Sequence, residues 1–482
     1  MNKKQRPIGI DLFAGAGGMS LGFEQAGFDV LAAVEIDPIH CAIHEFNFPL
    51  TSIFCKSIAE IKGEEIRNNS AIGKREIDVV FGGSPCQGFS MIGKRALDDP
   101  RNTLVFHFLR LILELQPKYF VFENVPGLTI GKHQNFLIEI IDEFRKCNYE
   151  VEEKYCVLNA SNFGVPQDRA RLFIIGCQQG LTLPKYPQAF TKPPLARNSK
   201  YIVNSPNLAN CPTVWDAIGD LPEIENYPEL FKRDWVIAKY NKPSKYGSIL
   251  RGILEMEDNY AYERIAPPLE KSIVASEVDG VNDSGILTCS TRTKHNSESI
   301  TRFQQTKPGE TESISHFHRL DYKSICNTLR AGTASNRGAF TSPRPIHPFV
   351  PRCITVREAA RLHSYPDWFR FHITKWHGFR QIGNSVPPLL AKAVASAIIH
   401  ALGINPVKPK NKINLVSANL LQFNMSQAAD YYAVPAHTIE PRVRQNKNIS
   451  MVDNIKIIDE KHYKLVSADA ISEKELQDYK NR

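Results

Sequence analysis

A short apolar segment that runs into a glycine-rich loop and then a helical pattern constrains this fold most. Residues 8–13 read as a buried strand, the loop at 14–18 contains Gly15, Gly17 and Gly18, and a helical pattern follows through residue 25. Glycines let the backbone approach a ligand closely, and a helix N-terminus attracts an anionic group. This order of elements predicts an α/β fold with a nucleotide-type cradle.

The second strand, at residues 30–34, supports the same interpretation. It is followed by Glu35, about 20 residues after the first glycine of the loop, which is the spacing at which an acidic side chain meets ribose hydroxyls in dinucleotide-binding folds. The glycine pattern alone is weak, and NAD would be the default ligand to infer from it.

Residues 78–90 hold the best candidate for a reacting side chain. Residues 78–81 read as a buried strand, and the loop at 82–88 contains Ser84, Pro85, Cys86 and Gln87. A thiol at the carboxyl end of a strand in an open α/β sheet lies where such sheets bind ligands. A small buried cysteine is the common alternative, although a core position does not need so stiff a loop. The loop by itself leaves both roles open.

Composition limits the class of protein. A chain of 482 residues can form more than one domain, and it contains no apolar run that we expect to span a bilayer. Its ten cysteines are scattered without a C-x-x-C pair, which predicts reduced thiols in the cytoplasm, with neither a disulfide framework nor a metal site. The net charge of +8 suits a polyanionic partner, but many basic proteins bind no nucleic acid.

Hydrophobic periodicity predicts further elements along the chain. We expect helices at residues 103–115, 136–145, 214–221, 260–266, 356–363 and 389–402, and strands at 120–122, 149–158 and 172–176.

Six segments together resemble the motifs of the DNA (cytosine-5)-methyltransferases. They are DLFAGAGG at 11–18, SPCQ with FS at 84–90, ENV at 123–125, QDRAR at 167–171, REAARL at 357–362 and GNSVP at 383–387. They occur in the family's usual order and cover residues 8–177 and about 345–402. Any one of them could arise by chance, whereas the ordered set is very specific.

The resemblance implies an arrangement of domains. Residues 1–180 would form a Rossmann-like, S-adenosylmethionine-dependent methyltransferase domain, and residues 181–375 a smaller, loop-rich target-recognition domain including its hinge. Residues 376–403 would return the chain to the catalytic domain, and residues 404–482 would form a C-terminal extension. Residues 426–443 of that extension resemble a helix–turn–helix, with residues 461–465 as a following wing, although Pro441 inside the second helix counts against it.

The resemblance also implies S-adenosylmethionine in place of NAD. Phe13 would pack against the adenine side, and Glu35 would bind the ribose. At Ser57 the family usually has an aspartate that binds the adenine amino group, so adenine recognition departs from the family pattern there. The full set of implied cofactor-binding residues is Phe13, Ala14, Gly15, Gly17, Gly18, Glu35, Ile36, Ser57, Ile58, Pro85, Leu104, Asn384 and Ser385.

For catalysis, the resemblance implies a covalent route. The Cys86 thiolate would add to carbon 6 of a cytosine flipped out of duplex DNA, Glu123 would donate to N3, and Arg171 would hold O2. Arg169 would support the thiolate and Glu123, and Gln87 belongs to the same catalytic set. No metal is required.

The resulting hypothesis is a DNA (cytosine-5)-methyltransferase of a restriction–modification system, acting on double-stranded DNA as a cytoplasmic monomer. A cognate restriction endonuclease would act on the same site, with no direct contact implied. One alternative is the tRNA-methylating branch of the family, whose Cys-Phe-Thr segment is missing from this sequence. The other is a catalytically silent DNA-binding regulator, which the presence of Cys86, Glu123, Arg169 and Arg171 disfavours.

Overall fold

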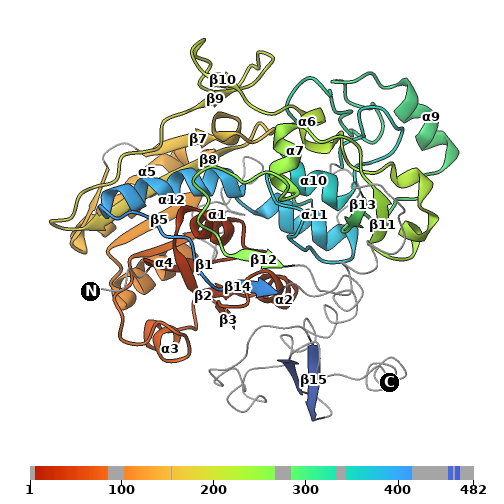
Figure 1. Cartoon of the computed structure of the whole chain (residues 1–482). Helices are drawn as coiled ribbons and strands as arrows, with labels where there is room; N and C mark the ends of the chain where they lie inside the picture. The colour runs from red at the N-terminus through yellow and green to blue at the C-terminus, as the bar shows by residue number, and fades with distance from the viewer. Residues whose placement is uncertain are drawn as a thin grey trace.

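The computed structural model of this chain describes residues 6–84, 103–152, 155–265, 284–332, 344–414, 454–459 and 462–466. Within them lies an eight-stranded mixed sheet with the order β3-β2-β1-β4-β5-β8-β6, and β7 pairs with β8 (Figure 1). The strands are β1 (Ile8–Leu12), β2 (Asp29–Glu35), β3 (Ser52–Cys55), β4 (Val79–Gly83), β5 (Tyr119–Asn124), β6 (Tyr149–Val151), β7 (Cys156–Asn159) and β8 (Ala170–Gln178).

The first five strands of that order are parallel to their neighbours, whereas β8 runs antiparallel to β5, β6 and β7. Parallel strands are covered on both faces, which explains why β1 is buried at every residue. The predicted α/β class is therefore confirmed, and the structure adds that the core of the sheet is parallel.

Helices cover both faces of the sheet. On one face α3 (Gly63–Asn68), α4 (Thr103–Leu115) and α5 (Lys132–Lys146) pack against Val80 and Phe122. On the other, α1 (Gly18–Ala26), the 3₁₀ turn η3 (Ala160–Phe163) and α12 (Pro388–Ala401) pack against Val79 and Phe81. Successive residues of β4 thus point to opposite cores, as the period of a strand requires. The sheet is flanked further by α2 (Pro38–Asn47) and the 3₁₀ turn η2 (Pro126–Thr129).

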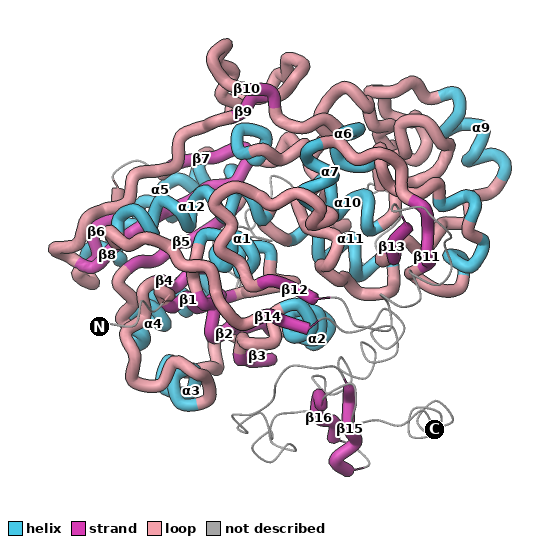
Figure 2. Tube along the Cα trace, in the orientation of Figure 1, coloured by secondary structure: helices cyan, strands magenta, loops and turns pink. Residues whose placement is uncertain are grey.

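Helix α12 comes from the C-terminal part of the chain, yet it returns to the sheet and lies beside α1 (Figure 2). Two glycines of α1 allow this approach. A Cβ at Gly18 would overlap the carbonyl oxygen of Val386, and one at Gly22 would overlap the Cβ of Ala391. The small residues of α1 are therefore needed for the return of the chain.

Most of the remaining elements form a second lobe beside the sheet (Figure 1). Its described helices and 3₁₀ turns are α6 (Val214–Ile218), η4 (Ile224–Asn226), η5 (Pro228–Phe231), α7 (Lys245–Leu250), α9 (Ser297–Gln305), α10 (Val356–Leu362) and α11 (Lys375–Asn384). Its strands β11 (Val236–Lys239) and β13 (Ser284–Leu287) are short and pair with each other. The strands β9 (Thr191–Lys192) and β10 (Ala209–Asn210) also pair, but they lie beside η3, where Asn162 donates to the carbonyl of Thr191.

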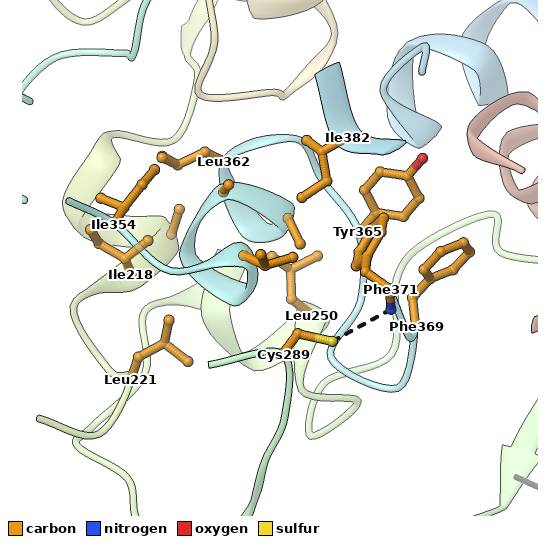
Figure 3. Close-up of a cluster of buried hydrophobic side chains, with 14 of the residues drawn as sticks. Ile218, Leu221, Leu250, Cys289, Ile354, Leu362, Tyr365, Phe369, Phe371 and Ile382 are labelled. Atoms are coloured by element: carbon orange, nitrogen blue, oxygen red, sulfur yellow. Dashed lines mark hydrogen bonds between the residues drawn. The ribbon is translucent and has the colours of Figure 1, made fainter. Parts of the chain in front are cut away.

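The core of this lobe combines apolar packing with buried arginines. Figure 3 shows Leu362 and Tyr365 among the apolar side chains, and the Sγ of Cys289 accepts a hydrogen bond from the Phe371 amide. Arg361 is fully buried and is neutralised by ion pairs with Asp220 and Asp367. Burying a guanidinium requires such partners, so these pairs fix α10 against its neighbours.

The stretch Lys375–Ala401 is long and apolar enough to cross a membrane by length and composition, a run that we did not expect from the sequence. It consists of two helices, α11 and α12, and 56% of its apolar window is buried inside the protein. Its apolarity is accounted for by packing against α1 and the second lobe.

The extension begins with an anchored segment. Strand β14 (Lys412–Asn414) pairs in parallel with β12 (Glu263–Ile265), and the carbonyl of Val407 accepts a hydrogen bond from Arg6. Further on, β15 (Asn454–Asp459) and β16 (His462–Val466) form an antiparallel pair, which overlaps the wing expected at 461–465. The helix–turn–helix segment at 426–443 lies outside the described residues.

Two expected elements were wrong. The helix at 260–266 is absent among the residues described there, where Glu263–Ile265 forms a strand. That strand pairs with β14, which is 149 residues further along the chain. A pairing over this distance cannot be predicted from the periodicity of the local sequence. The single strand at 149–158 is divided into β6 and β7, which pair with opposite ends of β8.

Gly22→Ala should lower the free energy of unfolding by about 1–3 kcal/mol, because the new methyl group overlaps α12. In a helix without this contact the same change stabilises by about 1 kcal/mol. The midpoint of thermal unfolding measures the effect. Ser396→Ala on the exposed side of α12 is the control and should change little. An unchanged or raised midpoint for Gly22→Ala would contradict the close packing.

Candidate active site

A cavity of about 550 Å³ lies at the carboxyl ends of the parallel strands. It is lined by the β1–α1 loop, the turn after β2, the ends of β4 and β5, the start of β8, and residues from 328–331 and 380–386. Parallel α/β sheets bind ligands at this edge, where strand ends and loops meet.

Most of the site residues expected from the sequence line this one cavity. They are Phe13, Ala14, Gly15, Gly18, Glu35, Ile36, Ser57, Ile58, Leu104, Glu123, Arg169, Arg171, Asn384 and Ser385. Gly17 is not a lining residue. It is the N-cap of α1 at φ 97°, where a side chain would be strained and would overlap the ring of Phe48. Pro85, Cys86 and Gln87 lie outside the described residues.

The Glu35 side chain organises the glycine loop. Its Oε2 accepts a hydrogen bond from the Gly15 amide at 2.8 Å, and its Oε1 accepts from the amides of Ile36 at 2.9 Å and Asp37 at 2.8 Å. These bonds fix the carboxylate at the cavity wall while leaving it lone pairs for a ligand.

Beneath the loop, Asp11, Ser20 and His44 form a buried hydrogen-bonded chain that the sequence analysis did not identify. The Ser20 hydroxyl lies 2.6 Å from Asp11 Oδ2, and His44 Nδ1 lies 3.3 Å from the Gly15 carbonyl oxygen. Burial raises the pKa of Asp11 to about 8 and lowers the pKa of His44 to about 4. A largely uncharged Asp11 and a neutral His44 thus support the loop from below at neutral pH.

At the other end of the cavity, Glu123 meets Arg171. The Arg171 Nε lies 3.0 Å from Glu123 Oε1, and both side chains are mostly buried. Gly83 is paired with Glu123 between β4 and β5, and a Cβ there would overlap Glu123 Oε2. Burial raises the pKa of Glu123, although Arg171 and Arg169 oppose the shift. The carboxyl therefore keeps its proton to a higher pH than an exposed glutamate does.

Arg169 has different partners from Arg171. Its guanidinium donates to the carbonyls of Leu329 at 2.8 Å, Gly383 at 2.7 Å and Ser385 at 2.8 Å. Its Nε is buried and has no acceptor among the described residues. Burial and the neighbouring Arg171 hold the pKa of Arg169 well below its usual range. The side chain ties the second lobe and the returning chain to the start of β8.

The wall between α2 and α11 is a further part of the cavity that sequence reasoning missed. It contains Asp37, His40, Arg380 and Gln381. The two helices are far apart in the sequence, so no short sequence motif indicates that these residues meet. Within the described residues, no group of three or more metal-ligating side chains is arranged to hold a metal ion.

Comparisons with known proteins identify close similarity along nearly the whole chain. The family model for the C-5 cytosine-specific DNA methylases matches residues 9–400. The type II methyltransferase M.XorII of Xanthomonas oryzae pv. oryzae is 55% identical over 439 residues, which are 91% of this chain and 95% of that protein. M1.HphI of Haemophilus parahaemolyticus is 34% identical over 395 residues, covering 81% of this chain and 86% of that protein.

Among solved structures, a DNA modification methyltransferase encoded within an E. coli prophage has a similar fold. The TM-score is 0.62 at 32% identity, and the match covers 83% of this chain and 100% of that chain.

Arg171→Met should raise the pKa of Glu123 further, because the guanidinium favours the ionised carboxyl and burial opposes it. The pKa can be measured from the carboxyl ¹³C shift of Glu123 as a function of pH, assigned with Glu123→Gln. Arg110→Met is the control, since Arg110 pairs with Glu114 on α4. A Glu123 pKa that stays constant or falls in Arg171→Met would show that the guanidinium does not oppose burial at this carboxyl.

Proposed function

This chain belongs to the C-5 cytosine-specific DNA methylase family and is a DNA (cytosine-5)-methyltransferase, and we propose that one cavity holds both its methyl donor and its target base. The observation that carries the proposal is the arrangement of that cavity. The glycine loop and Glu35 stand at one end, and Glu123 with Arg171 at the other. A donor and an acceptor bound in such a space would be held for direct transfer.

The proposed methyl donor is S-adenosylmethionine, which supplies an electrophilic methyl group when bound. The residues present fit it. The cavity volume is within the range of cofactor sites, Glu35 is held at the cavity wall by three backbone amides, and the apolar side chain of Ile36 is 67% exposed at the cavity. Phe13 and Ile36 would flank the adenine, while the N-terminus of α1 with Asn384 and Ser385 would face the amino-acid end.

For the target base, we assign the reacting groups to the other end of the cavity. The Cys86 thiolate would add to carbon 6, and the ring electrons would shift toward carbon 5 while N3 takes a proton from Glu123. Carbon 5 would then bond to the methyl group as the bond from that group to the donor's sulfonium sulfur breaks, which would leave S-adenosylhomocysteine. The carbon 5 proton would pass to water, N3 would return its proton to Glu123, and loss of the thiolate from carbon 6 would restore the ring. Cys86 follows Ser84, a cavity residue, by two positions in the chain.

Glu123 suits its role because a proton donor must be protonated when it acts. Its raised pKa supports this, and Arg171 beside it would hold O2 of the base. The two terminal nitrogens of Arg169, which donate to three carbonyls, would have a structural role, and its Nε would remain available to the reacting groups. Gln87 stays a predicted member of the set.

The relatives suggest the biological setting. M.XorII and M1.HphI are named type II methyltransferases, so we propose that this chain is the modification enzyme of a type II restriction–modification system. It would act on double-stranded DNA in the cytoplasm, as a monomer, and protect the site that a cognate endonuclease cuts.

Transfer of labelled methyl from S-adenosylmethionine to duplex DNA tests the function. We expect methylation of cytosine at one sequence, identified by sequencing methylated cytosines, and none on tRNA. A duplex with 5-fluorocytosine at that position should trap the enzyme covalently, and Cys86→Ser should abolish both transfer and trapping. Label on tRNA alone would support the tRNA branch, and DNA binding without any transfer would support a silent regulator.

Glu123→Gln should lower the rate of transfer by about 10²–10⁴-fold, because an amide donates a hydrogen bond but does not supply a proton. Binding of S-adenosylhomocysteine, measured by calorimetry, should change little. Glu114→Gln, on α4 outside the cavity, is a matched control. Weakened cofactor binding with a normal rate at saturation would place Glu123 at the cofactor end.

A further inference from the structure

The wall between α2 and α11 joins the two lobes at the cavity. Asp37 caps the N-terminus of α2, accepting from the amides of Ile39 and His40 through Oδ1. Its other oxygen, Oδ2, pairs with Arg380 Nη1 of α11 at 2.9 Å. The helix that follows β2 is thereby held against the helix that precedes α12.

Two polar atoms of this wall have no hydrogen-bond partner among the described residues. They are Nε2 of His40, a residue that is 4% exposed, and Nε2 of Gln381, a residue that is 1% exposed. Both residues line the cavity. A buried polar atom without a partner is costly, so two of them on one cavity wall indicate that a bound group satisfies them.

The hydrogen-bonding direction of each atom follows from its neighbours. Gln381 Oε1 accepts from the His372 amide at 3.0 Å, which fixes the side-chain amide and leaves Nε2 as a donor. His40 Nδ1 lies 3.9 Å from Glu35 Oε1, and this carboxylate favours a proton on Nδ1. In the neutral ring, Nε2 of His40 is then an acceptor. The wall therefore offers one donor and one acceptor.

A single hydroxyl can satisfy both atoms, because it can accept one hydrogen bond and donate another. A carboxylate only accepts and an ammonium only donates, so neither group alone satisfies both atoms. Glu35, which faces His40, is itself the residue proposed to meet the ribose. We propose that His40 and Gln381 bind a ribose hydroxyl of S-adenosylmethionine, an inference that rests on the cofactor proposed above.

Calorimetry with the full chain can test this, using S-adenosylhomocysteine and its 2′-deoxy and 3′-deoxy counterparts as probes. Gln381→Glu keeps the acceptor for the His372 amide and removes the donor, and His40→Leu removes the ring nitrogens. Each variant should bind S-adenosylhomocysteine about fivefold more weakly. The loss should vanish with one of the two deoxy probes. His400→Ala, exposed at the end of α12, should bind all three as the wild type does.

Other outcomes overturn the inference in distinguishable ways. Equal losses with all three probes would mean that the two residues act on folding or hold a water molecule. A loss that disappears with 5′-methylthioadenosine, which lacks the amino-acid end, would assign the pair to that end. No binding of S-adenosylhomocysteine by the wild type would refute the proposed cofactor itself.

A second measurement does not require a stable variant. In ¹⁵N-histidine-labelled wild type, the Nε2 resonance of His40 should shift when S-adenosylhomocysteine is added and should stay in place with one deoxy probe. A resonance that ignores all three ligands would exclude His40 from the contact.

Discussion

The buried guanidinium of Arg169 is the interaction on which the site depends. It donates to carbonyls of Leu329, Gly383 and Ser385, which belong to the edge of the second lobe and to the approach to α12. A charge this deeply buried requires those acceptors, so the strand that follows Arg169 and the returning chain are stable only together. The cavity lies beside these contacts of Arg169, with the glycine loop on one side and Glu123 on the other.

The two ends of the cavity use opposite means to prepare their carboxyl groups. Glu35 is surrounded by backbone amides, which hold its side chain in place at the cavity wall. Glu123 is buried, and the nearby Arg171 only partly offsets the rise in its pKa. One glutamate is thus held by backbone amides and the other keeps its proton to a higher pH, although both lie at the end of a strand of the same sheet.

The parts of this arrangement that could be predicted from sequence were local. The strand, glycine loop and helix at residues 8–25 and the strand before Glu123 depend on periodicity and turn residues within a few positions. Their place at one edge follows from the parallel sheet. The pairing of Asp37 with Arg380, the carbonyl partners of Arg169 and the strand β12 could not be predicted, because each joins segments that are distant in the sequence. The local pattern of hydrophobic residues does not depend on such distant contacts. At 260–266 this pattern predicted a helix where the structure has a strand.

The packing of α12 on α1 has a topological consequence. Arg6, at the start of the described chain, donates to the carbonyl of Val407, just beyond α12. The stretch of chain from the first strand to just beyond α12 therefore begins and ends at neighbouring points. Its fold does not require that synthesis start at the first strand. A short peptide joining residues 6 and 407, with the chain opened in a surface loop, would give a circular permutant that retains the sheet, both lobes and the cavity. In such a protein the glycine loop would be made shortly after GNSVP instead of long before it, with the same active site.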